Sequence, residues 1–260
     1  IYPCTVAKKP FLPLAAHIPL NTDYSPTFEI TYAFEVVGVL LGAWAGVNTD
    51  GLLIGFIIFI CAQLTLLNDS LEHLREHSMD VTDANEDASR GVLDEKMKAT
   101  LIDCINQHGQ ISEFKKEVSS IFGTITLSQF MVSVLTLCTN LFELTTVSEL
   151  NVQLFALLFY MMFLLTEIYC MCYFGNEIIL KSFQLTNSAY HSDWPNCSLD
   201  FKKNLIVFMT RSHIDMKYLA GNLFPLSLET FVKIIKSSVS YFTVLNQLGD
   251  SSEYETRNNL

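Results

Sequence analysis

Polar residues recur at helical spacing near the end of the chain. Alternating steps of four and three residues place them on one face of a helix: Glu229, Lys233, Lys236, Ser240, Thr243 and Gln247. Lipid does not tolerate unpaired polar groups, so such a stripe normally faces a protein interior or water. Several copies around a symmetry axis, each turning its stripe inward, would line a water-filled pore. The open alternative is that residues 229–236 lie in the headgroup zone and only the later part spans.

A second candidate for chemistry is the run from His73 to His77, which has the order H-x-x-E-H of one class of zinc peptidases. Both imidazoles lie on one helical face, as zinc ligands do. The pattern is short, however, and no third ligand is evident. The sequence also lacks a Gly-rich phosphate loop, a nucleophile elbow and a CxxC pair. We therefore expect no metal site, no cofactor and no enzymatic activity.

The composition is that of a membrane protein. Of 260 residues, 50% are hydrophobic and 17% are charged, whereas a soluble domain carries about 25% charge. The net charge of -11 argues against nucleic acid as a partner. The seven cysteines have no framework spacing, and the four inside apolar segments are expected to be small core residues rather than disulfides or metal ligands: Cys61, Cys138, Cys170 and Cys172. The chain begins without an initiator Met, so we expect the front of a longer protein to be absent.

Apolar stretches long enough to cross a hydrocarbon core of about 30 Å predict an all-α, polytopic membrane helical bundle. Lys and Arg are concentrated in two long loops, which places these loops in the cytoplasm and both ends of the chain, including the C-terminus, on the extracellular side. The predicted segments are 1–32, an extracellular loop; 33–67, a transmembrane helix with a cytoplasmic extension; 68–120, a cytoplasmic loop with an amphipathic helix; 121–143, a transmembrane helix; 144–151, a short extracellular loop; 152–180, a transmembrane helix; 181–222, a cytoplasmic loop and anchor region; 223–248, a pore-lining transmembrane helix; and 249–260, an extracellular tail. The sequons at Asn68 and Asn196 would then be cytoplasmic and unmodified.

The second half of the chain resembles the C-terminal signature of the insect odorant receptor family. The matching positions are 173–177 (YFGNE), Ser182, 189–190, Trp194, Lys202, 211–212, 219–221 (LAG), 226–228 (LSL), 230–231, 234–236 (IIK) and 240–242 (SYF). Residues 25–32 and 46–50 look similar to the start and the middle of the fourth helix of that family. The resemblance spans essentially the whole chain, which would correspond to helices four to seven of a seven-helix subunit, without the first three.

This resemblance implies a function and partners. The chain would be the odorant-binding subunit of an odorant-gated cation channel, in a tetramer with the olfactory co-receptor, in the plasma membrane of olfactory sensory neurons. The seventh helices would line the pore, and residues 241–248 look like the gate segment. The residues expected at the gate and along the pore wall are Val244, Leu248, Gln247, Ser240 and Thr243.

Two features favour a ligand-specific subunit over the co-receptor itself. Asn246 stands where the co-receptor has an apolar residue, and the long insertion expected of the co-receptor is missing. The alternatives left open are a gustatory receptor channel of the same superfamily and, from a different class, a secondary transporter.

We expect a small volatile odorant to bind in an apolar pocket between the outer halves of the helices. Burial of its hydrocarbon surface, at about 25 cal/mol per Å², would supply most of the affinity. The wall would draw on two sets of residues: Val37, Leu40, Leu41 and Trp44 of the first predicted span, and Phe155, Leu158, Phe159 and Met162 of the third. Much of this pocket would come from the absent second and third helices.

Overall fold

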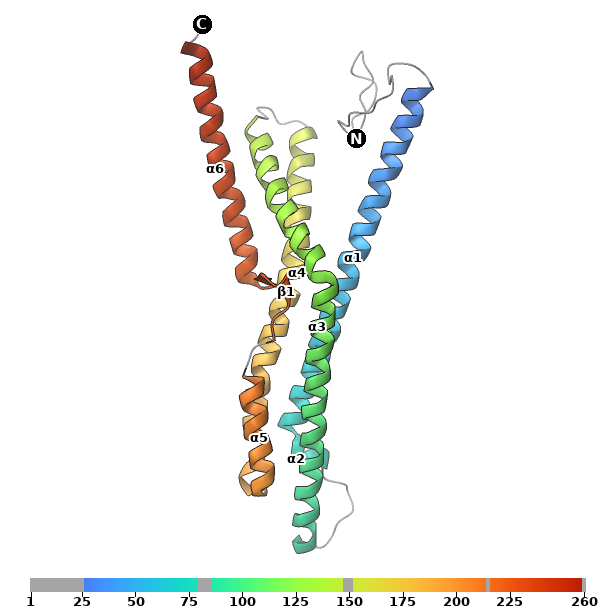
Figure 1. Cartoon of the computed structure of the whole chain (residues 1–260), viewed down its shortest axis with the longest axis vertical. Coiled ribbons are helices and arrows are strands. Elements are labelled where there is room, and N and C mark those ends of the chain that lie inside the picture. The colour runs from blue at the N-terminus through green and yellow to red at the C-terminus, as the bar shows by residue number, and fades with distance from the viewer. Residues whose placement is uncertain (1–25, 79–85, 147–151, 214–215, 259–260) are drawn as a thin grey trace. The chain divides into compact units, whose positions relative to one another are not determined.

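A computed structural model of the chain describes residues 26–78, 86–146, 152–213 and 216–258, and these are almost entirely helical. The predicted acidic loop around Asp80 and most of the predicted N-terminal loop lie outside the described residues. The elements are α1 (Thr27–Glu72), α2 (Leu74–Ser78), α3 (Glu86–Thr146), α4 (Val152–His191), the 3-10 turn η1 (Trp194–Asn196), α5 (Leu199–Ser212), β1 (Leu219–Ala220), β2 (Phe224–Pro225) and α6 (Leu228–Asn258) (Figure 1). The predicted all-α class is confirmed, with one short antiparallel hairpin added.

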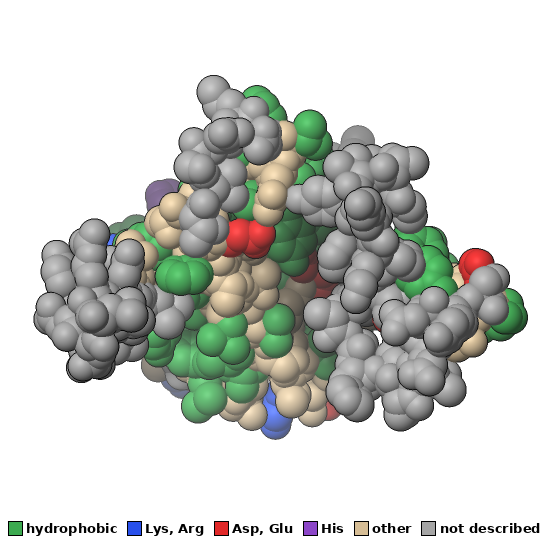
Figure 2. Space-filling model, turned by 90° about the horizontal axis from the view of Figure 1, so that it is seen from above, with side chains coloured by type: hydrophobic (Ala, Val, Ile, Leu, Met, Phe, Trp, Pro, Cys, Tyr) green, Lys and Arg blue, Asp and Glu red, His purple; other side chains and the backbone are tan. Residues whose placement is uncertain are grey.

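Three helices, α1, α3 and α4, are long and apolar enough to cross a membrane. Seen from above, hydrophobic and uncharged side chains make up most of the visible described surface (Figure 2). Large apolar side chains exposed in this number fit a lipid surrounding rather than water. Among the described helices α6 does not meet the same threshold, because its polar stripe lowers its mean hydropathy.

The chain divides into two compact units, residues 1–52 and 53–260. In the described part of the first unit, α1 continues through the polar run that begins at Asn48. Asn48 Nδ2 donates to the carbonyl of Trp44 at 2.6 Å, and Thr49 Oγ1 donates to the carbonyl of Ala45 at 2.9 Å. Because these side chains bond the preceding turn of their own helix, they are satisfied without breaking it.

In the second unit, α3 joins two predicted segments into one helix. The amphipathic stretch within 68–120 and the span 121–143 are both part of α3, which runs from Glu86 to Thr146. No proline interrupts this stretch, so the backbone hydrogen bonds continue although the surroundings of the helix change from polar to apolar. The predicted boundary between residues 120 and 121 is therefore not a helix end.

The core of the second unit follows one face of α1 and continues into α2. The fully buried residues are spaced by three and four, as on a single helical face: Leu53, Ile57, Ile60, Leu64, Leu67, Leu71 and Leu74. Asn68 on the same helix donates to the carbonyl of Lys181 at 3.0 Å and accepts from Ser188 Oγ at 2.9 Å. These bonds tie α1 to α4 and occupy the amide of the first sequon.

The β1–β2 hairpin fits against α3 and α4 through three glycines. A Cβ on Gly175 of α4 would lie 2.3 Å from Leu226 Cβ and 2.7 Å from the Leu226 carbonyl oxygen. At the hairpin tip, Gly221 has a φ of 57° and its N–H donates to the carbonyl of Gly123 at 2.8 Å. Only glycine allows both the positive φ and this close approach.

The predicted start of the last helix at Leu223 is wrong. Phe224–Pro225 pairs as β2 with β1, and α6 begins at Leu228 after a serine cap, with the amide of Thr230 donating to Ser227 Oγ at 3.3 Å. Thr230 Oγ1 also donates to the carbonyl of Pro225 at 2.6 Å, which closes the turn into the helix. At the other end, α6 continues through the predicted tail to Asn258.

Replacing Gly175 by Ala should destabilise the fold. The added methyl overlaps Leu226 side-chain and backbone atoms, and overpacking of this kind costs about 1–3 kcal/mol. Thermal unfolding of the detergent-purified receptor would measure the change. Gly109→Ala in α3 is the matched control, because nothing lies within 4 Å of its added Cβ. Equal melting temperatures for the two variants would contradict the close docking of the hairpin on α4.

Candidate functional site

The last helix has one face packed on its own subunit. Thr230, Ile234 and Ser238 are 5%, 7% and 2% exposed, and they recur at a spacing of four. This face of α6 packs against α3 and α4. Ser238 Oγ donates to the carbonyl of Ile234 at 2.9 Å, so its hydroxyl is satisfied within the helix. The packed face therefore uses small side chains that allow close helix approach.

The predicted polar stripe lies on the exposed part of α6. All six of its members are exposed: Glu229, Lys233, Lys236, Ser240, Thr243 and Gln247. Two of them are partners, since Lys233 Nζ lies 2.7 Å from Glu229 Oε1. Thr243 Oγ1 donates to the carbonyl of Val239 at 2.9 Å. The stripe is thus turned away from the subunit, where water or another subunit can meet it.

The residues expected at the gate lie at the far end of this stripe. Ser240, Thr243 and Gln247 are exposed, and the Val244 side chain is 51% exposed beside them. The backbone of Leu248 is helical, but its side chain lies outside the described part of the chain. Their role in gating stays a prediction.

The residues expected to line an odorant pocket form two exposed apolar faces. In the first unit, Val37, Leu40, Leu41 and Trp44 are exposed, Trp44 by 70%. In the second unit the four predicted side chains of α4 are exposed in the same way: Phe155, Leu158, Phe159 and Met162. Each set follows the spacing i, i+3, i+4, i+7 of one helical face. That the two faces share a pocket stays a prediction.

A polar pair that the sequence did not predict joins α3 to α4 within their apolar stretches. Gln129 Nε2 donates to Glu167 Oε1 at 2.5 Å, and both side chains are half-buried. Ionisable groups at membrane depth are costly unless they are paired, so this bond makes Glu167 tolerable there. The signal in the sequence was Glu167 itself, the one charged residue from 152 to 176, which requires a partner.

The histidine motif has an ion-pair role in the structure. His73 Nδ1 lies 3.4 Å from Asp69 Oδ1, and His77 Nε2 lies 3.9 Å from Asp69 Oδ2, all on exposed side chains. Within the described residues no group of three or more metal-ligating side chains is close enough to hold an ion. The two histidines thus lie on one helical face because they follow Asp69 by four and by eight residues, and both contact its carboxylate.

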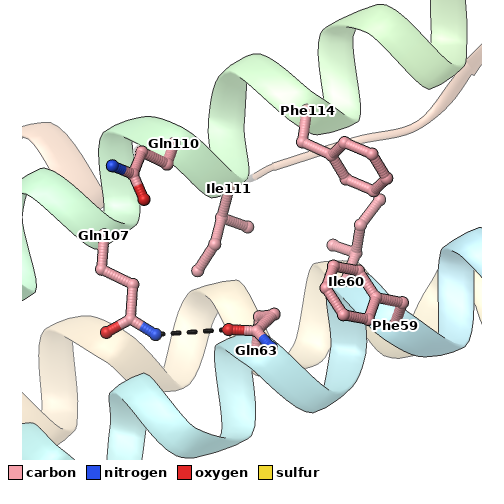
Figure 3. A pocket seen from close by; sticks show the side chains of 7 residues that line it. All are labelled: Phe59, Ile60, Gln63, Gln107, Gln110, Ile111 and Phe114. Atoms are coloured by element: carbon pink, nitrogen blue, oxygen red, sulfur yellow. Dashed lines mark hydrogen bonds between the residues drawn. The ribbon is translucent and has the colours of Figure 1, made fainter.

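A cavity of about 200 Å³ lies between α1 and α3 in the second unit (Figure 3). Phe59, Ile60 and Phe114 line one end, while Gln107 Nε2 donates to Gln63 Oε1 at 3.4 Å at the other. Small-molecule sites usually begin at about 300 Å³. Because the cavity is smaller and lies outside the predicted spans of α3, we do not assign odorant binding to it.

Long apolar helices, together with a final helix that exposes a polar face, define a polytopic helical membrane protein. The family model described as 7tm Odorant receptor matches residues 1–239, and the chain belongs to this family. The predicted resemblance is therefore confirmed, and it favours the odorant over the gustatory alternative.

Known relatives agree with this assignment. Odorant receptor Or2 of Anopheles gambiae is 25% identical over 238 residues, which cover 91% of this chain and 61% of that protein. Odorant receptor 94a of Drosophila melanogaster is 25% identical over 236 residues, which cover 90% of this chain and 57% of that protein. The chain thus spans about three fifths of the length of these relatives. They are receptors and not enzymes.

A solved structure has the same fold. The insect olfactory receptor OR5 from Machilis hrabei, in complex with eugenol, matches with a TM-score of 0.76 at 20% identity, over 90% of this chain and 57% of that one. A second structure of the same receptor matches with a TM-score of 0.73 at 21% identity, over 89% of this chain and 56% of that one. At this identity the likeness establishes the arrangement of the helices.

Replacing Gln129 by Leu should destabilise the receptor, because Glu167 then loses a hydrogen-bond donor at membrane depth. Coupling energies of such pairs average about 0.6 kcal/mol and reach about 1.7 kcal/mol. A double-mutant cycle with Gln129→Leu and Glu167→Leu, measured by thermal unfolding in detergent, would give the coupling, because each change removes one partner of the hydrogen bond. Ser128→Ala is the control, because Ser128 is exposed and its hydroxyl donates to the carbonyl of Ile125 in its own helix. Additive effects of the two changes would contradict the pairing.

Proposed function

We propose that this chain forms the odorant-binding subunit of an odorant-gated cation channel. In this proposal it assembles with the olfactory co-receptor as a heterotetramer in the plasma membrane of olfactory sensory neurons. The family assignment supports this function, since the matched relatives are odorant receptors and the related Machilis hrabei receptor was solved with the small volatile eugenol.

The observation that carries the proposal is the two-sided character of α6. Thr230, Ile234 and Ser238 pack on the subunit, while the polar stripe faces away from it. A single subunit gives the stripe no enclosed water. Four copies of such a helix around an axis would surround a hydrated path, as cation channels require.

The proposed valve lies near the end of this path. Val244 and Leu248 would form an apolar ring that keeps the closed pore dry, with Gln247 beside it. Ser240 and Thr243 would offer hydroxyls to water and ions on the near side of the ring. Opening then requires α6 to move the apolar side chains apart.

The proposed odorant site uses the two exposed apolar faces. Val37, Leu40, Leu41 and Trp44 would form one wall, and the predicted residues of α4 would form another. An odorant can open the channel only if it binds the open state more tightly than the closed state. We infer that the pocket changes shape when α4 and α6 move together, because these helices pack on each other.

The orientation in the membrane is also part of the proposal. The long polar segments rich in Lys and Arg would face the cytoplasm, and the C-terminal end of α6 would face the outside. In this orientation the hydrogen bonds of Asn68 to Lys181 and Ser188 lie in the cytoplasmic half, where no glycan is added.

Cysteine accessibility tests the pore wall. Ser240→Cys or Thr243→Cys, expressed with the co-receptor, should be modified by a membrane-impermeant thiol reagent applied during odorant stimulation, and the current should change at least about twofold. Ser238→Cys is the matched control on the same helix, because Ser238 is only 2% exposed and packs on the subunit.

Two native thiols outside the predicted spans, those of Cys104 and Cys197, should give little background in this assay. Burial, with a smaller contribution from Asp103, raises the pKa of Cys104 to about 11. Burial also raises the pKa of the Cys197 thiol. A thiol with a raised pKa has little reactive thiolate at neutral pH. Equal modification of the Ser238→Cys and Ser240→Cys variants would contradict the assignment of the pore wall. So would the absence of modification in both the Ser240→Cys and the Thr243→Cys variant.

Replacing Val244 by Ser should raise the resting conductance, because a polar ring no longer excludes water from the closed pore. Two-electrode recording without odorant would measure the leak. Val239→Ser is the control, since Val239 has a similar exposure, 48% against 51%, but lies about 140° around the helix. An unchanged resting conductance for Val244→Ser would count against this residue as part of the valve.

A further inference from the structure

A second cavity, of about 340 Å³, lies where α3 meets the β1–β2 hairpin. It brings together Lys115 and Lys116 of α3 and Lys217, which precedes β1. Its volume falls in the range of small-molecule sites, about 300–1,000 Å³. Among the described residues that line it there is no carboxylate. We propose that this pocket binds the phosphate group of an anionic lipid headgroup at the cytoplasmic surface of the membrane.

The lysines are held together by the fold. Lys115 is half-buried, and its Nζ donates to the carbonyl of Lys217 at 3.2 Å. An ammonium has three donors, so this bond leaves further donors for an anion. Burial and the adjacent Lys116 lower the pKa of Lys115, which indicates that positive charge is crowded here. A bound phosphate would compensate that charge.

The neutral groups of the pocket form a rigid cradle. Ser119 Oγ donates to the carbonyl of Leu219 at 3.0 Å, and the amide of Gly221 donates to the carbonyl of Gly123 at 2.8 Å. These bonds fix the hairpin on α3. The hydroxyls of Ser120 and Thr124 and the tip residue Asn222, all exposed, then line the open side of the pocket as further hydrogen-bonding groups.

Acidic side chains nearby do not occupy the pocket. Glu229 is near enough to Lys217 for the two charges to interact. The direct partner of Glu229, however, is Lys233, whose Nζ lies 2.7 Å from Glu229 Oε1. Glu113 and Glu117 of α3 are exposed and do not line the cavity. Among the described residues, no acidic side chain therefore lines the pocket with the three lysines.

The position of the pocket along α3 favours a lipid as the source of that anion. The uncharged stretch of α3 begins at residue 118, one residue after the two lysines and directly after Glu117, so the pocket would lie at the boundary between headgroups and hydrocarbon. The cytoplasmic leaflet is rich in anionic lipids, and basic pockets beside membrane helices bind their headgroups. The assignment to the cytoplasmic side rests on the proposed orientation, not on channel activity.

Such a site would act on the pore helix through the hairpin. The chain leads from Lys217 through β1 and β2 directly into α6 at Leu228. A headgroup that bridges α3 and the hairpin would favour the docked position of the hairpin, and with it one position of α6. Lipid occupancy would then bias gating without touching the odorant pocket.

Binding can be measured on the purified receptor assembly in detergent micelles with a fluorescent short-chain phosphatidylinositol bisphosphate as the probe. We expect Lys116→Gln with Lys217→Gln to weaken binding at least about tenfold, because both side chains are exposed and can be changed without disturbing the core. Ser120→Asp, which adds an anion to the pocket, should weaken binding similarly. The matched control is Lys98→Gln with Lys203→Gln. This pair removes the same two positive charges, but both lysines lie beside Asp200, outside the pocket.

Competition distinguishes the source of the phosphate. Displacement of the probe by unlabelled phosphatidylinositol bisphosphate, with weaker displacement by inositol trisphosphate and none by phosphatidylcholine, would support a lipid headgroup site. Displacement by inorganic phosphate or inositol trisphosphate at lower concentration than the lipid would overturn the lipid assignment. Equal loss in the pocket and control variants, or no loss in either, would overturn the site. None of these outcomes depends on odorant-evoked current, so the proposed channel function is tested separately.

Discussion

The docking of the β1–β2 hairpin against α3 and α4 is the constraint on which the rest of the second unit depends. Gly175 lets the Leu226 backbone approach α4, and Gly123 receives the amide of Gly221. An added methyl group would lie 2.3 Å from Leu226 Cβ at Gly175, which is an overlap, and 3.2 Å from Gly221 N and Leu219 O at Gly123, which is tighter than an ordinary contact. A close-packed interior cannot accommodate such overlaps. The glycines therefore hold the hairpin in one position on α3 and α4, and this position fixes where α6 begins.

This fixed origin explains how a helix with a polar stripe can be placed in an apolar fold. Ser227 and Thr230 cap α6 and bond it back to Pro225, while Ile234 and Ser238 pack on the subunit. The packing sets the rotation of the helix, and the rotation sends its polar side chains outward. A stripe displaced by one residue would turn by about 100° and bury charged groups against α3 and α4. The hairpin therefore determines which face of α6 is turned away from the subunit.

Much of this arrangement could be predicted from periodicity, and the rest could not for identifiable reasons. The spacing of Glu229 to Gln247 located the exposed stripe, because helical faces are a local property. The start of α6 was missed because Phe224 and Pro225 form a strand only through pairing with Leu219 and Ala220. The bond between Gln129 and Glu167 depends on the register of α3 against α4, which no single segment encodes. Whether the predicted pocket walls face each other also depends on how separate helices pack, which the sequence of one segment does not determine.

Several of the residues that carry the family resemblance hold the hairpin or the start of α6. Gly175, Ser182, Gly221, Ser227 and Thr230 each make a docking or capping contact; Ser182 Oγ, for example, accepts from the amide of Met216 at 3.1 Å. The proposed odorant walls, by contrast, consist of exposed apolar side chains that bond nothing within the subunit's core. Apolar side chains on an exposed face can change size and shape at little cost to the fold, whereas the glycines cannot. Close packing thus restricts which residues the signature positions can hold. The exposed apolar positions of the proposed odorant walls have no such restriction, so ligand preference can vary there.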